Sequence, residues 1–447
     1  MTAPSRPRHL VTLPLFLALL LGFVPSVRAA LQWDEEGLPS GGTVMVAGGI
    51  SPTLATLRMI VPAGTADSAD DPLLAPLACR AFLGTTAPDG TPLAAYLAQR
   101  GWTAESFCEL EGAELALSGP ADGLDAMMDL LLARLEAPED LDAAALDAAW
   151  RALEADWGRW AGVSEIALRA AMARAAYGDA DYGVGEQRVR PEGAGKPSLD
   201  ALRAFVGRRY QAGAAMLLVA GDVEPGAFLD RWRARLQALP GRLLPLPERG
   251  EATRVAREVK RADARQTLFI AQFPGPRGDA LDAAAFAVAA GVLNKFIDTD
   301  VRAAGLCRSG SAWYDFTSPG PRPLEITLRG VDVARLPALR QRIARLCERM
   351  RDGEFSEYAM LSAKDVLFER IDAAAGKGKP PRGDDAQSLS LWSREVLREA
   401  LYFRRWRAEF LRHLQALGKE QVREAARSLL QLDHATLGLL LPPESLD

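Results

Sequence analysis

Histidine is scarce in this 447-residue chain, which contains only three: His9, His413 and His434. His9 precedes an apolar run near the amino terminus, and neither of the others is followed three or four residues later by a histidine, cysteine or acid. A hydrolytic zinc site needs several such ligands close together. The sequence therefore predicts that this chain alone holds no catalytic zinc of the usual kind.

Cysteine is almost as rare, and its four residues form no C-x-x-C pair: Cys79, Cys108, Cys307 and Cys347. A zinc–cysteine site is disfavoured, because no histidine lies near any of them in the sequence either. Two cysteines fall in each half of the chain, so an oxidising compartment would permit one disulfide per half. The sequence leaves their pairing open.

Long apolar runs are absent after residue 30. Before it, Arg6 and Arg8 precede an apolar stretch at 10–24, and V-R-A at 27–29 is typical of a signal-peptide cleavage site. We predict that residues 1–29 are removed and that the protein is exported, to the periplasm if the source is a Gram-negative bacterium. An uncleaved anchor is the alternative, because the stretch is only somewhat shorter than the roughly 20 residues that span a bilayer.

Basic clusters are missing as well. Cleavage after residue 29 would remove three arginines and change the formal net charge from −5 to −8. An acidic protein without a basic patch is not expected to bind nucleic acid or an anionic membrane surface. After cleavage we expect no stable membrane insertion.

The chain does contain a pattern of strands and helices that occurs twice. Apolar strands at 55–61 and 267–273 are each followed by a buried helix, predicted at 71–83 and 281–296. Long amphipathic helices and a late strand follow in both halves. Repeats of this length indicate duplicated domains rather than the shorter units of a solenoid.

We therefore predict an α+β fold with two homologous domains, each an antiparallel-rich sheet with helices packed on one face. The domains are expected at 30–239 and 255–447. Between them, 240–254 is rich in proline and glycine, which indicates an exposed linker.

Several segments of the first half carry a family resemblance through their order and spacing. They read D-P-L-L-A-P-L-A-C-R-A-F-L-G-T at 71–85, A-Y-G-D-A-D-Y-G at 176–183, L-R-A-F-V-G-R-R-Y at 202–210 and L-L-V-A-G-D-V at 217–223. Together they resemble the insulinase/pitrilysin family of zinc peptidases, the inverted zincins. The resemblance covers both halves and implies a fold like that of mitochondrial processing peptidase.

In that family the helix before F-L-G-T carries H-x-x-E-H, with two zinc-binding histidines and a glutamate that activates water. The resemblance places these positions at Ala75, Ala78 and Cys79, so the two ligands and the general base are absent. It also places the third zinc ligand at Glu154. A lone carboxylate holds a divalent ion poorly, so Glu154 is interpreted as a relict or surface acid.

Cys79 has two further interpretations. It could act as a nucleophile with a basic partner, but no histidine or asparagine pattern accompanies it. A cysteine on a helix of leucine and alanine is more often an inert small hydrophobe or half of a disulfide.

The second half offers three candidate substrate contacts. Active members of the family present R-x-x-x-G-L-x-Y there, whereas this chain reads V-R-A-A-G-L-C-R at 301–308. The resemblance implies peptide contacts for Arg302, Arg308 and nearby Tyr314. Ordinary packing or surface roles are the alternative for all three.

These features lead to two hypotheses of function. The first is an inactive subunit that pairs with a catalytic zinc peptidase of the same family and forms part of its peptide chamber; zinc would be present only in the partner. The second is a stand-alone peptide-binding or scaffolding protein, which includes the case of a homodimer. In both, the chain alone is not expected to be an enzyme.

Overall fold

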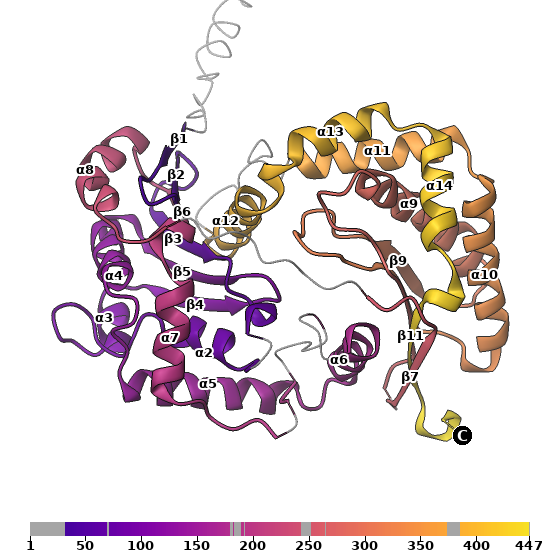
Figure 1. The fold of residues 1–447 in the computed structure, drawn as a ribbon, viewed down its shortest axis with the longest axis horizontal. Coiled ribbons are helices and arrows are strands. Elements are labelled where there is room, and N and C mark those ends of the chain that lie inside the picture. Colours follow the sequence, from indigo (N-terminus) through magenta and orange to yellow (C-terminus); the bar gives the residue numbers. More distant parts are fainter. Residues whose placement is uncertain are drawn as a thin grey trace, which may run out of the picture.

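The computed structural model describes residues 32–68, 71–178, 182, 189–191, 193–242, 252–263, 265–372 and 385–446. Within them the chain forms two α+β halves that lie beside each other (Figure 1). The predicted signal peptide and positions 243–251 of the predicted linker lie outside the described residues. No helix in the described ranges is both long enough and apolar enough to cross a membrane.

The first half is built on a six-stranded mixed sheet in the order β1-β2-β6-β3-β5-β4. Only β2 and β6 pair in parallel; the other neighbours are antiparallel. The strands are β1 (Gln32–Gly37), β2 (Thr43–Gly48), β3 (Leu54–Val61), β4 (Thr103–Cys108), β5 (Ala113–Pro120) and β6 (Met216–Gly221).

Six helices pack with one face of this sheet or extend that layer. They are α2 (Leu74–Ala81), α3 (Leu93–Gln99), α4 (Leu124–Glu136), α5 (Ala143–Trp160), α7 (Leu199–Arg209) and α8 (Pro225–Gln237). Alternate strand residues such as Val44, Leu57 and Met59 join these helices in one core. Ser198 is the N-cap of α7, because its hydroxyl oxygen accepts a hydrogen bond from the Ala201 amide.

The second half repeats this plan without the outermost strand. Its five strands are ordered β7-β11-β8-β10-β9, with β7 and β11 parallel. The elements are β7 (Arg257–Ala262), β8 (Leu268–Phe273), α9 (Ala283–Phe296), β9 (Ser309–Trp313), β10 (Leu324–Arg329), α10 (Leu336–Asp352), α11 (Glu357–Asp372), α13 (Arg407–Ala416), α14 (Lys419–Leu429) and β11 (Thr436–Leu441). The buried helix α9 corresponds to α2, and the edge strand β9 to β4.

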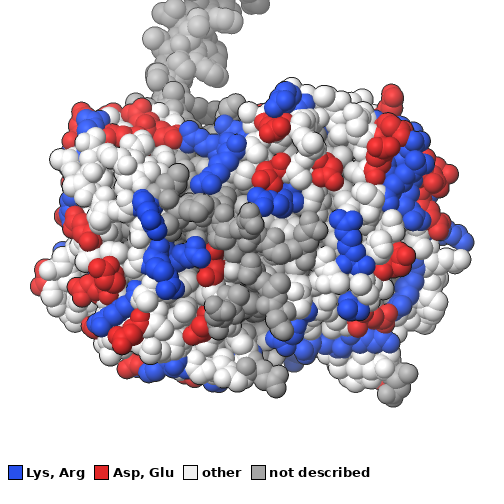
Figure 2. Space-filling model, viewed as in Figure 1, with Lys and Arg blue, Asp and Glu red and all other residues white. Residues whose placement is uncertain are grey.

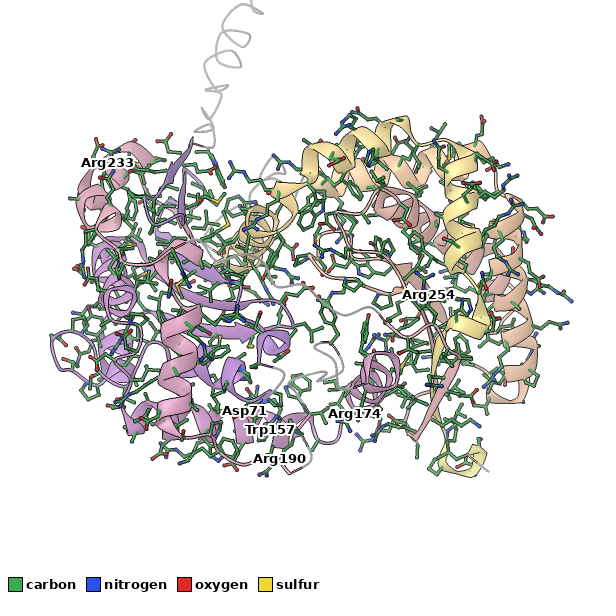
Figure 3. All side chains as sticks on the ribbon, viewed as in Figure 1. Asp71, Trp157, Arg174, Arg190, Arg233 and Arg254 are labelled. Atoms are coloured by element: carbon green, nitrogen blue, oxygen red, sulfur yellow. The ribbon has the colours of Figure 1, made fainter. Side chains whose placement is uncertain are left out.

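One helix of each half packs on the sheet of the other half. Helix α6 (Ser164–Tyr177) packs on β7 and β11 of the second sheet, where Leu168 and Met172 meet Ile270 and Leu440. Figure 3 shows Arg174, which marks α6, beside the second half. Helix α12 (Ala386–Leu401) covers β3 and β6 of the first sheet. Each sheet is therefore covered on its second face by a helix from the opposite half.

Arg58 joins α12 to the first sheet. It lies on the central strand β3 and is completely buried, with an ion pair to Glu114 on β5. Its Nε donates to Ser393 Oγ at 3.0 Å and its Nη2 to the Ser390 carbonyl at 2.9 Å. A buried guanidinium with five donors requires such acceptors, so this residue fixes where α12 lies.

The α+β prediction with two similar sheets is confirmed. The structure adds strand β1 and helices α12 and α13, none of which the repeat pattern indicated. On the face in view, acidic and basic side chains are interspersed (Figure 2).

A carboxylate–arginine network at α6 makes stability depend on pH. Arg329 hydrogen-bonds Glu165 at 2.8 Å and thereby lowers its pKa. Burial opposes the charge of Glu325, but hydrogen bonds of 2.9 and 2.7 Å from Arg169 outweigh it, so its pKa is lowered too. Acids with depressed folded pKa values stabilise the fold above their unfolded pKa, about 4.3, and lose this contribution as pH falls through the folded values.

We therefore expect the urea midpoint of unfolding to decrease when the pH is lowered from 6.5 to 3. The decrease should be smaller in the Glu165→Gln/Glu325→Gln variant. The double variant should already have a lower midpoint at pH 6.5. An equal pH dependence in both proteins would contradict this account.

Candidate peptide-binding cavity between the two halves

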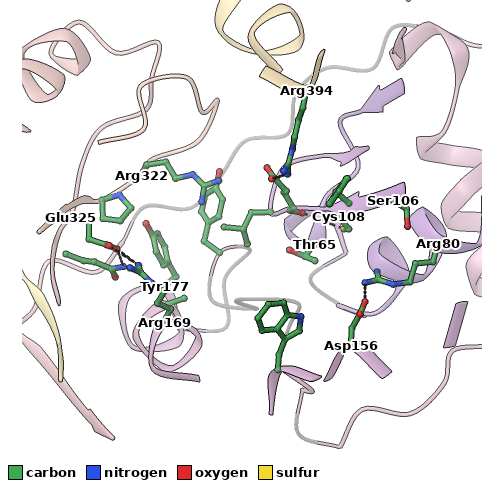
Figure 4. A pocket seen from close by; sticks show the side chains of 18 of the residues that line it. Thr65, Arg80, Ser106, Cys108, Asp156, Arg169, Tyr177, Arg322, Glu325 and Arg394 are labelled. Carbon is green, nitrogen blue, oxygen red and sulfur yellow. Dashed lines mark hydrogen bonds and ion pairs between the residues drawn. The ribbon is translucent and has the colours of Figure 1, made fainter. Parts of the chain in front are cut away.

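A cavity of about 870 Å³ lies where the two halves face each other (Figure 4). The first half contributes β4 with its following turn, together with Arg80 of α2 and Asp156 of α5. Helix α6 and the loop before β10 form the opposite wall, and Arg394 reaches in from α12. The volume is within the range of sites that hold a ligand of several hundred daltons.

Strand β4 presents an open edge to this cavity. Among the residues that the structure describes it pairs only with β5, and the hairpin is closed by a hydrogen bond of 2.8 Å from the Glu109 amide to the Gly112 carbonyl. Because hydrogen-bonded and non-hydrogen-bonded pairs alternate in an antiparallel ladder, the backbone N–H and C=O of Ser106 point away from β5. Ser106 lines the cavity, so this edge can accept an extended peptide as a further strand.

Beside β4 lies the helix to which the resemblance assigned the zinc ligands. Ala75 and Ala78 are completely buried. The Cys79 Sγ contacts the carbonyl oxygens of Phe107 at 3.3 Å and Glu114 at 3.4 Å. Burial raises the pKa of the Cys79 thiol to about 12, so the thiol is protonated at neutral pH. Its packing favours the inert interpretation over the nucleophilic one.

The acid of α5 that pairs with α2 is Asp156 and not Glu154, which the resemblance placed at the third ligand position and which was interpreted as a relict or surface acid. Asp156 forms an ion pair of 2.7 Å with Arg80, whose other Nη donates to the Pro76 carbonyl at 3.0 Å. Glu154 is exposed. Side chains two positions apart on a helix point in directions that differ by about 200° around its axis, so Glu154 and Asp156 face opposite sides of α5. An arginine–carboxylate pair thus lies beside the degenerate helix.

The described residues contain no group of three or more metal-ligating side chains. We predict that the purified protein contains substoichiometric zinc and that EDTA leaves its thermal midpoint unchanged, since a metal bound only to the native state would stabilise it. Elemental analysis and a thermal melt with and without chelator check this. Stoichiometric zinc that EDTA removes with a lower midpoint would contradict it.

The three predicted substrate contacts of the second half do not line this cavity. Arg302 is exposed and pairs with Asp298 at 3.4 Å, and Arg308 is exposed as well. Tyr314 is buried, and its hydroxyl donates to the Pro276 carbonyl at 2.9 Å. Tyr314 therefore packs inside the second half, and the substrate contact that the resemblance implies for it stays a prediction.

The second-half wall of the cavity includes Arg322, which no sequence motif indicated. Arg322 lies 3.4 Å from Glu111 of the β4–β5 turn, and Tyr182 and Ser318 donate hydrogen bonds to the same carboxylate. Burial opposes the charge of Arg322, but Glu111 and other acidic groups outweigh it and raise its pKa. This cluster joins the two halves beside the cavity, which Tyr182 and Arg322 line. No motif indicated it, because its members come from distant segments.

All four cysteines are free thiols and buried, so neither half contains the disulfide that the sequence permitted. Stability therefore depends on packing and on the polar contacts between the halves.

The fold and the cavity define a class: an α+β protein of two similar halves whose helix beside the edge strand has no metal-ligating side chains at Ala75 and Ala78. Residues 197–367 match the family model described as the peptidase M16 inactive domain. Comparison with curated proteins gives no match.

Solved structures similar over nearly the whole chain belong to the same family or are proteases. A peptidase M16 inactive domain from Pseudomonas fluorescens has 18% identity and a TM-score of 0.69, covering 92% of this chain and 98% of that one. A protease from Helicobacter pylori has 12% identity and a TM-score of 0.69, covering 92% and 100%. An M16-like protein from Alicyclobacillus acidocaldarius has 15% identity and a TM-score of 0.68, covering 93% and 100%.

The match over residues 197–367 and the shared fold support the predicted resemblance to the peptidase M16 family, the pitrilysin/insulinase family.

Proposed function

We propose that this protein is an inactive subunit that binds extended peptides in the cavity between its halves and pairs with a catalytic zinc peptidase of the same family. The observation that carries the proposal is the open edge of β4 beside a helix without metal ligands. The edge supplies backbone donors and acceptors that any extended peptide can use. Catalytic zinc would belong to the partner chain.

The cavity supports binding of polar, extended segments. Its wall carries charges of both signs, among them Arg80, Asp156, Arg169 and Glu325. These groups are paired with one another in the structure, with 2.7 Å between Arg80 and Asp156 and 2.7 Å between Arg169 and Glu325. A bound peptide would therefore compete for already paired charges, which favours backbone pairing over charge as the main source of affinity.

Export and pairing are part of the proposal. The predicted signal peptide would place the chain outside the cytoplasm, where an exported catalytic partner would meet it. Helix α2 has the apolar residues Ala75 and Ala78 where the resemblance expects a zinc ligand and the general base. The helix can therefore be buried without a metal ion, because no unpaired polar group is buried with it.

The test is reconstitution. The mature chain is purified alone and with any M16 chain that carries intact H-x-x-E-H and co-purifies with it, and hydrolysis of an internally quenched peptide library is measured. We expect no hydrolysis by the lone chain and activity of the complex above that of the partner alone. Hydrolysis by the lone chain would overturn the proposal. Peptide binding without any partner that gains activity would favour the stand-alone binding protein.

A further inference from the structure

A second cavity, of about 620 Å³, lies entirely within the second half between α9, β9 and α11. Its wall is mainly apolar and includes Ala290, Trp313, Tyr358 and Val366. Sites of this size and composition commonly bind the apolar part of a ligand, with a few polar groups that fix its orientation.

The rim of this cavity exposes an unusual number of large apolar side chains. Among the lining residues, Trp313 is 48% exposed, Tyr358 78% and Val366 61%. Tyr358 and Val366 lie on α11. Single exposed apolar residues are common, but several around one concave site indicate a surface that is covered by a ligand.

Arg370 of α11 lines the same cavity, and its guanidinium carbon lies 3.8 Å from the centroid of the Trp313 ring. Across the described part of the chain, no residue accepts a hydrogen bond from this guanidinium or forms an ion pair with it. The acids that act on it, Asp315 and Glu395, do so only at longer range, and Asp315 accepts hydrogen bonds of 3.1 and 2.6 Å from Thr317. A partly buried arginine stacked on tryptophan keeps its planar donors available for a carboxylate.

The edge strand here differs from β4, because its outward-facing backbone is already occupied. The Asn294 side chain donates to the Ala312 carbonyl at 2.9 Å and accepts from the Ala312 amide at 2.7 Å. This carboxamide takes the place of a neighbouring strand, so a peptide cannot pair with β9 at that point. A ligand of this cavity must be recognised by its end group and its side chain.

We infer that this cavity binds the carboxyl terminus of a peptide whose last residue is bulky and apolar, with the carboxylate on Arg370 and the side chain against Trp313 and Val366. Lining groups such as Ser356, Ser362 and Thr299 can bond the preceding amides, which a simple fatty acid would leave unused. The site is separate from the β4 cavity and does not depend on the function proposed for it.

The test measures fluorescence anisotropy of the mature chain with a labelled peptide that ends in Ala-Leu-Phe, as the free acid and as the amide. We expect the acid to bind about 10- to 100-fold more tightly, the range for hydrogen bonds to a charged group. Arg370→Gln should remove this preference. Arg412→Gln, an exposed arginine on α13, is the matched control and should keep it.

Three outcomes would overturn the inference. The first is equal binding of acid and amide, and the second is an unchanged preference in Arg370→Gln with a native circular dichroism spectrum. The third is displacement of the peptide by decanoate at a lower concentration than by the unlabelled peptide acid, which would make a fatty acid the better ligand. A Ser106→Pro variant, which blocks the β4 edge, should leave the acid preference intact and so separates this site from the other cavity.

Discussion

The Arg58→Met variant should lower the free energy of unfolding by about 3–5 kcal/mol, the usual cost of removing one partner from a buried ion pair. Methionine fills much of the same space but provides no donor. The Glu114 carboxylate would then keep its contact with Arg394 at 3.2 Å, and the Ser390 carbonyl would keep only the hydrogen bond of 2.9 Å from Ser393 Oγ among its side-chain donors. Urea unfolding followed by circular dichroism measures the effect.

Two controls separate charge from packing. Arg58→Met/Glu114→Gln removes the stranded carboxylate and should recover part of the loss. Arg412→Gln changes an arginine whose side chain is 71% exposed and should shift stability by less than about 0.5 kcal/mol. A loss in Arg58→Met no larger than in Arg412→Gln would show that α12 is held without this network.

The Ser106→Pro variant should weaken binding of an extended peptide about 5- to 10-fold. Proline removes the outward-facing amide of β4, which would donate to an added strand, and one such hydrogen bond plus the local disturbance amounts to about 1–1.5 kcal/mol. Proline is tolerated on an edge strand where the amide faces solvent, so the fold should persist. Isothermal titration with an unstructured peptide measures the affinity.

Ser106→Ala is the matched control, because it keeps the backbone amide and removes only the hydroxyl group. It should bind peptide like the unchanged protein. If Ser106→Pro has a native melting curve and full affinity, peptides do not pair with β4 and the proposed function loses its main support.

The sequence allowed the fold class to be predicted because strand and helix periodicities are local signals. The order of a strand, a buried helix and later amphipathic helices occurs in both halves, and the structure has α2 and α9 where the pattern expects them. The exchange of α6 and α12 could not be predicted in this way. An amphipathic pattern shows which face of a helix is apolar, but not which of two similar sheets that face meets.

The candidate site was predicted only in part for a related reason. The degenerate helix was found from its motif, whereas the choice between Glu154 and Asp156 required the rotation of α5 relative to α2. No sequence motif indicated Arg322 or Arg370, since each of them contacts residues that are distant in the sequence. Tyr314 was chosen by residue type, and type does not distinguish a buried hydroxyl from an exposed one.

The exchange of helices has a consequence for the order in which the chain can fold. The last strand of the first sheet ends at Gly221, but the helix that covers its second face, α12, spans Ala386–Leu401. Ile60 and Leu218 belong to the same core as α12. During synthesis, α12 therefore cannot cover these residues of the first half until most of the chain has been made. Domains usually fold one after another as they emerge. Here the first half can be completed only by the second, so a chain truncated before α12 should aggregate rather than yield a stable half.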